Sequence, residues 1–151
     1  IYPWGNKPPA HDIARYHQEW TKEIAHHVMV PVNIFQEGAS PYGVYNMAGN
    51  VKEWVDDWFD REYYDDPANH INPKGQIGGE FKVLKGGSWR DLKGFIYSSF
   101  RNSNYPGSRL DDYGFRCAKT IGAKGETKQL TKRPHLEMPH HMQASYQTVG
   151  K

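Results

Sequence analysis

The chain has 151 residues, of which 37% are hydrophobic and 14% are phenylalanine, tryptophan or tyrosine. Aromatic rings must therefore supply much of the buried surface of a single domain, which is unusual for a helix bundle. The net charge is +2 with acidic and basic residues interspersed, so the sequence offers no basic surface for nucleic acid. No apolar stretch approaches the roughly 20 residues of a membrane-spanning helix, and no direct membrane span is expected.

Residues 12–27 carry the first regular pattern in the chain. Four apolar residues recur there at helical spacing: Ile13, Tyr16, Trp20 and Ile24. This spacing predicts an amphipathic surface helix that packs one face on the domain, with Asp12 as its cap. A ligand role for His11 or His17 is the alternative to this packing role.

Short strands and turns fill the middle of the chain. Trp54, Val55 and Trp58 suggest a short buried strand or helical turn, and residues 60–79 form a polar surface loop. Strands are predicted at 81–85, 96–101 and 113–119. Gly86 and Gly87 permit a tight bend or a close backbone approach after the first of them. Short strands, few helices and long ordered loops together favour the α+β class.

Four segments, in this order and at this spacing, resemble the formylglycine-generating enzyme (sulfatase-modifying factor) family. They are Tyr2-Pro3-Trp4-Gly5-Asn6, then Tyr42 through Trp54 (YGVYNMAGNVKEW), Val83-Leu84-Lys85-Gly86-Gly87-Ser88-Trp89 and Gly114-Phe115-Arg116-Cys117. The resemblance covers about residues 1–120 and implies a C-type-lectin-like fold of short antiparallel strands and long loops.

The resemblance also implies a domain organisation. The four segments correspond to the carboxy-terminal half of the family's domain, so the preceding half is expected in a separate polypeptide, a cleaved fragment or another part of the same gene product. Residues 1–120 would form this part of the domain. Residues 121–151 are polar and poor in apolar side chains, which predicts an extended tail.

The resemblance implies a copper centre that this sequence cannot build. Enzymes of the family oxidise a substrate cysteine with copper held by two cysteines just after the Gly-Gly-Ser element, and soft thiolates suit Cu(I). Residues 89–97, which follow Ser88, contain no cysteine. The only cysteine of the chain, Cys117, is expected to be a small buried side chain at a strand end. The chain is therefore predicted to be a non-catalytic member without copper at this position.

A calcium site is implied by the same resemblance. The family binds calcium in the loop that corresponds here to Asn46, Gly49, Val51 and Glu53, through an asparagine, two backbone carbonyls and a glutamate. All four residues offer oxygen, the donor that Ca²⁺ prefers. The alternative is that Asn46 and Glu53 hydrogen-bond the backbone of their own turn. A second calcium site of the family has no matching residues between positions 14 and 32.

Two further groups of residues are candidates for binding. An exposed recognition surface is expected after the Gly-Gly-Ser element, because aromatic and arginine side chains dominate interface energies. Its residues would be Trp89, Arg90, Asp91, Phe95 and Tyr97, with burial beneath the loops as the alternative for Trp89. In the tail, imidazole and thioether groups could bind a metal or dock on a partner. They are His135, Met138, His140, His141 and Met142.

Three functions are compatible with these features. The first is a non-catalytic binding or structural subunit of a larger assembly, with a protein partner. The second is a formylglycine-generating type of oxidoreductase acting on protein cysteine, completed by another chain or using different metal chemistry. The third is a lectin-fold ligand-binding module. The family resemblance implies an extracytoplasmic location, either periplasmic or secreted.

Overall fold

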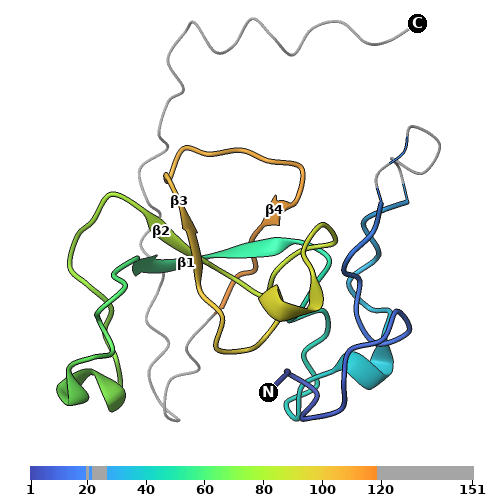
Figure 1. Ribbon diagram of the computed structural model, residues 1–151, viewed down its shortest axis with the longest axis horizontal. Coiled ribbons are helices and arrows are strands. Elements are labelled where there is room, and N and C mark those ends of the chain that lie inside the picture. Colours follow the sequence, from blue (N-terminus) through green and yellow to red (C-terminus); the bar gives the residue numbers. More distant parts are fainter. Residues whose placement is uncertain (20, 22–26, 119–151) are drawn as a thin grey trace, which may run out of the picture. The chain divides into compact units, whose positions relative to one another are not determined.

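The computed structural model describes residues 1–19, 21 and 27–118, and Ile1–Cys117 form one compact unit. Its centre is a four-stranded sheet (Figure 1). The strands are β1 (Lys52–Trp58), β2 (Lys82–Lys85), β3 (Asn102–Asn104) and β4 (Tyr113–Gly114). Their order across the sheet is β3-β2-β1-β4, so β1 and β2 occupy its middle.

Two of the three strand pairs are antiparallel and one is parallel. β1 pairs with β2, Trp54 opposite Leu84, and a bulge interrupts the register before Trp58. β2 pairs with β3 in the same antiparallel sense. The chain then crosses to the far side of β1, where β4 runs parallel to it with Tyr113 opposite Lys52. The expected antiparallel strands are thus present, together with one parallel pair that the sequence pattern did not predict.

The Gly-Gly turn after β2 makes the close backbone approach that its sequence predicted. Gly86 and Gly87 have φ angles of 87° and 66°, a region of backbone conformation that residues other than glycine rarely adopt. A Cβ atom on Gly87 would lie 2.7 Å from Ile96 Cγ2, and one on Gly86 would lie 2.9 Å from the carbonyl oxygen of Met47. This turn delivers the next two residues, Ser88 and Trp89, into the interior.

The core lies where this turn meets β2 and the amino-terminal loops. Its buried apolar side chains are Ile13, Ala14, Tyr16, Val28, Ala48, Val83, Leu84, Trp89 and Ile96. Tyr2 and Trp4 pack against part of this core, with their rings stacked at 5.1 Å. Aromatic rings therefore supply much of the packing, as the composition indicated.

Helical structure among the described residues is limited to three short 3₁₀ helices, none long and apolar enough to cross a membrane. They are η1 (Gln36–Gly38), η2 (Pro67–His70) and η3 (Lys93–Phe95).

The helix predicted for residues 12–27 is wrong over its described part, residues 12–19. The N–H group of Ala14 bonds to the carbonyl of Ala10, which closes a single turn. The N–H group of His17 then bonds to the carbonyl of Asp91, 2.9 Å away in a distant loop. Backbone pairing with another segment has thus replaced the helical pattern, although Ile13 and Tyr16 are buried as expected. Except for residues 21 and 27, the rest of the predicted helix lies outside the described residues.

Two strand predictions need correction. Residues 96–101 form no strand, and the strand lies just beyond them at β3. The buried side chain of Ile96 packs beneath the Gly-Gly turn, which holds this segment away from the edge of the sheet. The predicted strand at 113–119 is limited to β4 over its described residues. Beyond Gly114 no other described segment pairs with it, and Phe115 and Cys117 are exposed. The prediction of a buried Cys117 is therefore wrong.

The long polar loop predicted at residues 60–79 is present and is called here the excursion. Figure 1 shows it in green, extending from the end of the sheet and including η2. Most of its residues are exposed. Asp66 caps η2 by accepting a hydrogen bond from the N–H group of Ala68 at 2.9 Å.

Candidate functional site

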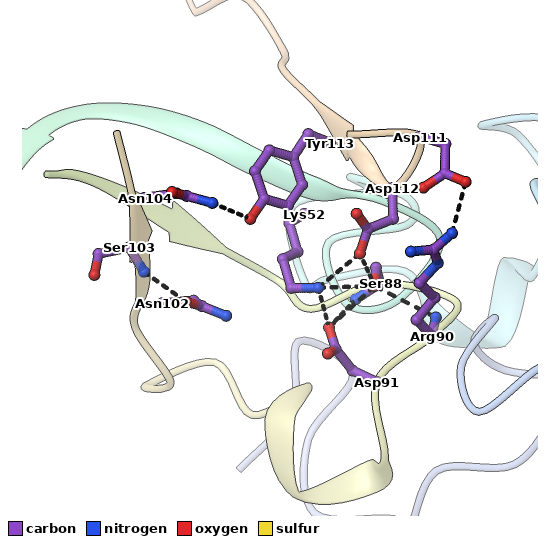
Figure 2. Close-up of polar contacts among 10 residues, drawn as sticks. All are labelled: Lys52, Ser88, Arg90, Asp91, Asn102, Ser103, Asn104, Asp111, Asp112 and Tyr113. Atoms are coloured by element: carbon purple, nitrogen blue, oxygen red, sulfur yellow. Dashed lines mark hydrogen bonds and ion pairs between the residues drawn. The ribbon is translucent and has the colours of Figure 1, made fainter. Parts of the chain in front are cut away.

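A buried lysine at the start of β1 organises the most strongly charged cluster of the described residues (Figure 2). The Nζ atom of Lys52 lies 2.8 Å from Asp91 Oδ2 and 2.8 Å from Asp112 Oδ2. It also donates a hydrogen bond to the hydroxyl of Ser88 at 3.0 Å. Lys52, Ser88, Asp91 and Asp112 are defined here as the Lys52 cluster. The cluster joins β1, the Gly-Gly turn and the loop before β4.

Ser88 connects the two carboxylates of the cluster. Its hydroxyl lies 2.8 Å from Asp112 Oδ2 and 3.1 Å from Asp91 Oδ2, and its backbone N–H group donates to Asp91 at 2.8 Å. Backbone bonds reinforce the same junction, because the N–H group of Lys52 bonds to the carbonyl of Asp112 at 2.8 Å. Every polar group at the centre of the cluster is therefore satisfied, which buried charges require.

The protonation states follow from this arrangement. Burial alone would lower the pKa of Lys52, but hydrogen bonds to Asp112 and Asp91 outweigh it and raise that pKa above its usual value. Burial alone would raise the pKa of Asp112, but its bonds to Lys52 and Ser88 lower it. The cluster thus keeps Lys52 as an ammonium group and Asp112 as a carboxylate across the neutral pH range.

This charge state removes nucleophilic chemistry from Ser88. Lysine activates a serine hydroxyl only when its amine is neutral and can accept the proton. The ammonium of Lys52 has no free lone pair, and the Ser88 side chain is fully buried. Lys52 and Ser88 lie within hydrogen-bond distance but do not form a serine–lysine pair for hydrolysis. The Lys52 cluster instead holds three segments of the chain together.

The residues expected to form a recognition surface after the Gly-Gly-Ser element divide between surface and interior. Trp89 is only 1% exposed, so its burial beneath the loops is what the structure shows. The carboxylate of Asp91 belongs to the Lys52 cluster. Arg90 is exposed, stacks on the Trp89 ring at 4.6 Å and pairs with Asp111 at 2.6 Å. Phe95 is exposed and Tyr97 is half-buried.

A cavity of about 520 Å³ lies beside Phe95. Its lining includes His11, Tyr16, His17, Leu92, Lys93 and Phe95. The rings of His11 and Tyr16 stack at 4.8 Å, and Phe95 keeps 44% of its surface exposed. The cavity therefore combines exposed apolar surface with groups that can carry positive charge.

The loop predicted to bind calcium has the donor types for that ion but pairs its carboxylate with arginine. Asn46 is buried, and its Oδ1 atom has no hydrogen-bond partner. Asn46 and Gly49 have φ angles of 50° and 79°, which curl the loop. Both carboxylate oxygens of Glu53 pair with Arg116, which also donates to the carbonyl of Asn46 at 3.0 Å. The loop thus contains a buried amide oxygen without a partner and a carboxylate held by Arg116, and both are donor types that a hard cation prefers.

The described residues contain no group of three or more histidine, cysteine, aspartate or glutamate side chains placed to hold a metal. The histidines and methionines of the tail, His135 to Met142, lie outside these residues. Their metal-binding or docking role stays a prediction.

Sequence reasoning missed Lys52, Ser88 and Asp112 as members of one site. One signal was available for Lys52, because alternation places it on the same face of β1 as the half-buried Trp54. A lysine on an inward face needs a carboxylate partner. The sequence does not indicate which of its 17 acidic residues supplies it.

Replacing Lys52 by methionine is expected to destabilise the fold by about 3–5 kcal/mol, since the buried carboxylate of Asp112 and the partly buried carboxylate of Asp91 lose their counter-ion. Urea unfolding at neutral pH measures this loss. Lys7→Met is the matched control, because Lys7 forms an exposed pair with Glu37 and should cost less than about 1 kcal/mol. Equal effects of the two substitutions would contradict the assigned role of Lys52.

The pH dependence of stability tests the same cluster. The lowered pKa of Asp112 contributes stability that is complete above its unfolded value and lost as the pH falls below about 4. The raised pKa of Lys52 contributes stability that is lost only as the pH rises beyond about 10.5. Asp112→Asn should therefore remove part of the acid-side loss, and an unchanged acid profile would argue against this ion pair.

Comparison with known proteins agrees with the resemblance found in the sequence. A family model described as "Sulfatase-modifying factor enzyme 1-like domain" matches residues 1–121. The formylglycine-generating enzyme of Mus musculus is 35% identical over 128 residues, which cover 78% of this chain and 33% of that protein. The "Inactive C-alpha-formylglycine-generating enzyme 2" of Mus musculus is 31% identical over 135 residues, covering 83% of this chain and 39% of that protein.

Parts of two other proteins are also similar to this chain. The "Serine/threonine-protein kinase pkn1" of Chlamydia caviae is 44% identical over 84 residues, which cover 55% of this chain and 14% of that protein. Among solved structures, Treponema denticola variable protein 1 superposes with a TM-score of 0.53 at 27% identity, covering 70% of this chain and 35% of that one. The chain thus spans well under half the length of each of these proteins.

The fold is accordingly that of formylglycine-generating-enzyme-like proteins, a loop-rich sheet of the C-type-lectin kind with few helices. With residues 1–121 matched, the chain belongs to the sulfatase-modifying factor enzyme 1-like (formylglycine-generating-enzyme-like) domain family.

Proposed function

We propose that this chain is a non-catalytic member of its family that serves as a binding or structural accessory subunit of a larger assembly. The observation that carries the proposal is the Lys52 cluster. It places Asp91, a residue of the segment just after the Gly-Gly-Ser element, in a buried ion pair. In the family's enzymes two cysteines of that segment hold copper, whereas residues 89–97 of this chain provide none.

The chemistry of the donors supports this proposal. Carboxylates and an ammonium group are hard and charged, whereas Cu(I) is held by soft thiolates. The chain has one thiol, that of Cys117, which lies on an exposed segment. An internal ion pair in this segment keeps the loops fixed and leaves their outer surface available to a partner. An extracytoplasmic location, periplasmic or secreted, is part of the same proposal.

Copper binding and peptide oxidation test the absence of catalysis. The purified protein, incubated with Cu(I) and desalted, is expected to retain no stoichiometric copper and to leave the cysteine of a Cys-x-Pro-x-Arg peptide unoxidised. The measurements are metal analysis and peptide mass spectrometry, with a catalytic family member as the positive control. Copper-dependent conversion of that cysteine to formylglycine would establish the alternative, an oxidoreductase acting on protein cysteine, and refute the proposal.

A calcium ion held by Asn46, Gly49, Val51 and Glu53 is the second part of the proposal. The orphaned Oδ1 atom of Asn46 supports it, because a buried oxygen without a donor is costly unless a cation or water satisfies it. The side chain of Glu53 would exchange Arg116 for the ion. Bound calcium would neutralise the carboxylate and fix the curled loop next to β1.

Glu53→Ala should abolish any rise in melting temperature that calcium produces relative to excess chelator. The readout is the difference between the melting temperatures with calcium and with chelator, because loss of the ion pair with Arg116 also changes the stability of the variant directly. Glu37→Ala, which removes an exposed carboxylate elsewhere, should retain the full calcium response. A wild-type melting curve identical with calcium and with chelator would reject the site.

A lectin-fold ligand-binding module is the second candidate function, and the cavity beside Phe95 favours it. Exposed aromatic surface next to histidine and lysine side chains is typical of a small-molecule site. A glycan array and a small-molecule thermal-shift screen are expected to show binding that Phe95→Ser weakens by about tenfold or more, as loss of one buried aromatic contact would. Tyr105→Ser, an exposed aromatic outside this cavity, is the control. If neither screen yields a ligand, this second candidate function is rejected and the accessory role is the one that remains.

A further inference from the structure

The end of β1 and the start of the excursion are more acidic than the chain as a whole. Between residues 56 and 66, six acidic residues stand against one basic residue, Arg61. The acidic residues are Asp56, Asp57, Asp60, Glu62, Asp65 and Asp66. The whole chain, by contrast, has a net charge of +2. The negative charge is therefore concentrated at the end of β1 and the start of the excursion.

Half of these acidic residues are used within the protein. Asp60 and Asp66 accept hydrogen bonds from backbone N–H groups of their own turns, and Asp56 lies 3.6 Å from Lys82. Among the described residues, no ion pair involves the carboxylates of Asp57, Glu62 or Asp65, and all three are exposed. Within the part of the chain that the structure describes, the charge of these three carboxylates is not neutralised by an ion pair.

The excursion also exposes apolar side chains around a hollow. Ile71 is 80% exposed and Ile77 is 101% exposed, and both line a concavity of about 680 Å³. Asp57 lies at its edge, because a Cβ atom on the lining residue Gly75 would be 3.0 Å from Asp57 Oδ1. Lys74 is the basic residue of the lining. Exposed aliphatic surface with a charged rim is a recurrent feature of interaction sites.

Internal hydrogen bonds make the excursion a preformed surface. The Tyr63 hydroxyl accepts the N–H group of Gly75 at 3.0 Å, and Asn69 donates to the Tyr63 carbonyl at 2.7 Å. At the base of the excursion, the N–H group of Phe59 bonds to the carbonyl of Phe81 at 2.8 Å. A partner would therefore meet a surface that is already ordered, which lowers the entropic cost of binding.

We propose that the excursion, together with Asp57 at the end of β1, is a docking surface for a basic amphipathic segment of a partner protein. The lysine or arginine side chains of that segment meet Asp57, Glu62 and Asp65, while its apolar side chains cover Ile71 and Ile77. Charge complementarity selects this partner, since an acidic segment or an anionic lipid surface would be repelled. The inference rests on the proposed accessory function and names the chemistry of its partner.

Fluorescence anisotropy with three labelled peptides tests the inference on the full chain. An amphipathic lysine/leucine peptide is expected to bind. A glutamate/leucine peptide with leucine at the same positions should not bind, nor should a lysine/serine peptide that lacks the apolar face. Raising the salt concentration to about 0.5 M should weaken the binding, because screening reduces surface electrostatic attraction.

Paired variants separate the two contributions. Ile71→Ser combined with Ile77→Ser should weaken binding at least about tenfold. Asp57→Asn combined with Asp65→Asn should weaken it by about threefold to tenfold and reduce its salt dependence. Val32→Ser with Leu110→Ser, and Asp12→Asn with Glu19→Gln, are exposed apolar and acidic controls outside the excursion that should leave binding unchanged. All these positions are exposed, so the variants should keep the wild-type melting temperature.

Several results would overturn the inference. One is equal binding of the glutamate/leucine peptide. Another is unchanged binding after either double substitution in the docking surface. The last is binding to phosphatidylcholine vesicles without binding to the lysine/leucine peptide. The last result would identify a lipid surface as the occupant. Copper-dependent cysteine oxidation would refute the accessory function yet leave the peptide measurements standing, so the two failures can be told apart.

Discussion

One ammonium group determines how the loops of this domain meet. Lys52 bonds to Asp91 and Asp112, and Ser88 lies between the two carboxylates. These residues come from β1, the segment after β2 and the loop before β4, which are far apart in sequence. Buried carboxylates without a counter-ion would each cost several kcal/mol, on the order of the whole stability of a domain this small. The parallel pairing of β1 with β4 and the seating of the Gly-Gly turn therefore both depend on this lysine.

The features that the sequence predicts well are those that a short segment decides alone. Gly86 and Gly87 require positive φ angles and leave no room for a Cβ atom, so their sequence indicated the bend directly. β2 is correct because its apolar residues have no competing pattern. The helix predicted from residue 12 fails over residues 12–19, because its apolar spacing fits a buried loop equally well. Once the His17 N–H group bonds to the Asp91 carbonyl, helical pairing at that position is lost. Apolar periodicity predicts which side chains are buried, and Ile13 and Tyr16 are indeed buried. It does not predict which backbone groups form hydrogen bonds with each other.

The candidate site was less accessible to sequence reasoning, because its contacts span long separations in the chain. Glu53 and Arg116 belong to two of the segments that resemble the family, yet nothing in either segment shows that these residues, 63 positions apart in the chain, pair with each other. Lys52 could have been recognised as inward-facing from its alternation with Trp54, whereas Asp112 carries no local signal. Cys117 illustrates the opposite error: its residue type favours burial, but no described segment pairs with the chain beyond Gly114, and the thiol is exposed.

Stability and the proposed lack of catalysis share one physical cause at the Lys52 cluster. The cluster can be buried only while Lys52 remains protonated, since a neutral amine would leave Asp91 and Asp112 repelling each other. Protonation also prevents the amine of Lys52 from activating Ser88. The carboxylates of Asp91 and Asp112 are hard donors close to the Gly-Gly turn. In the proposed function the centre of these loops is therefore structural. Recognition would use the outer surfaces, where the excursion has hydrogen bonds within its backbone and exposed isoleucines.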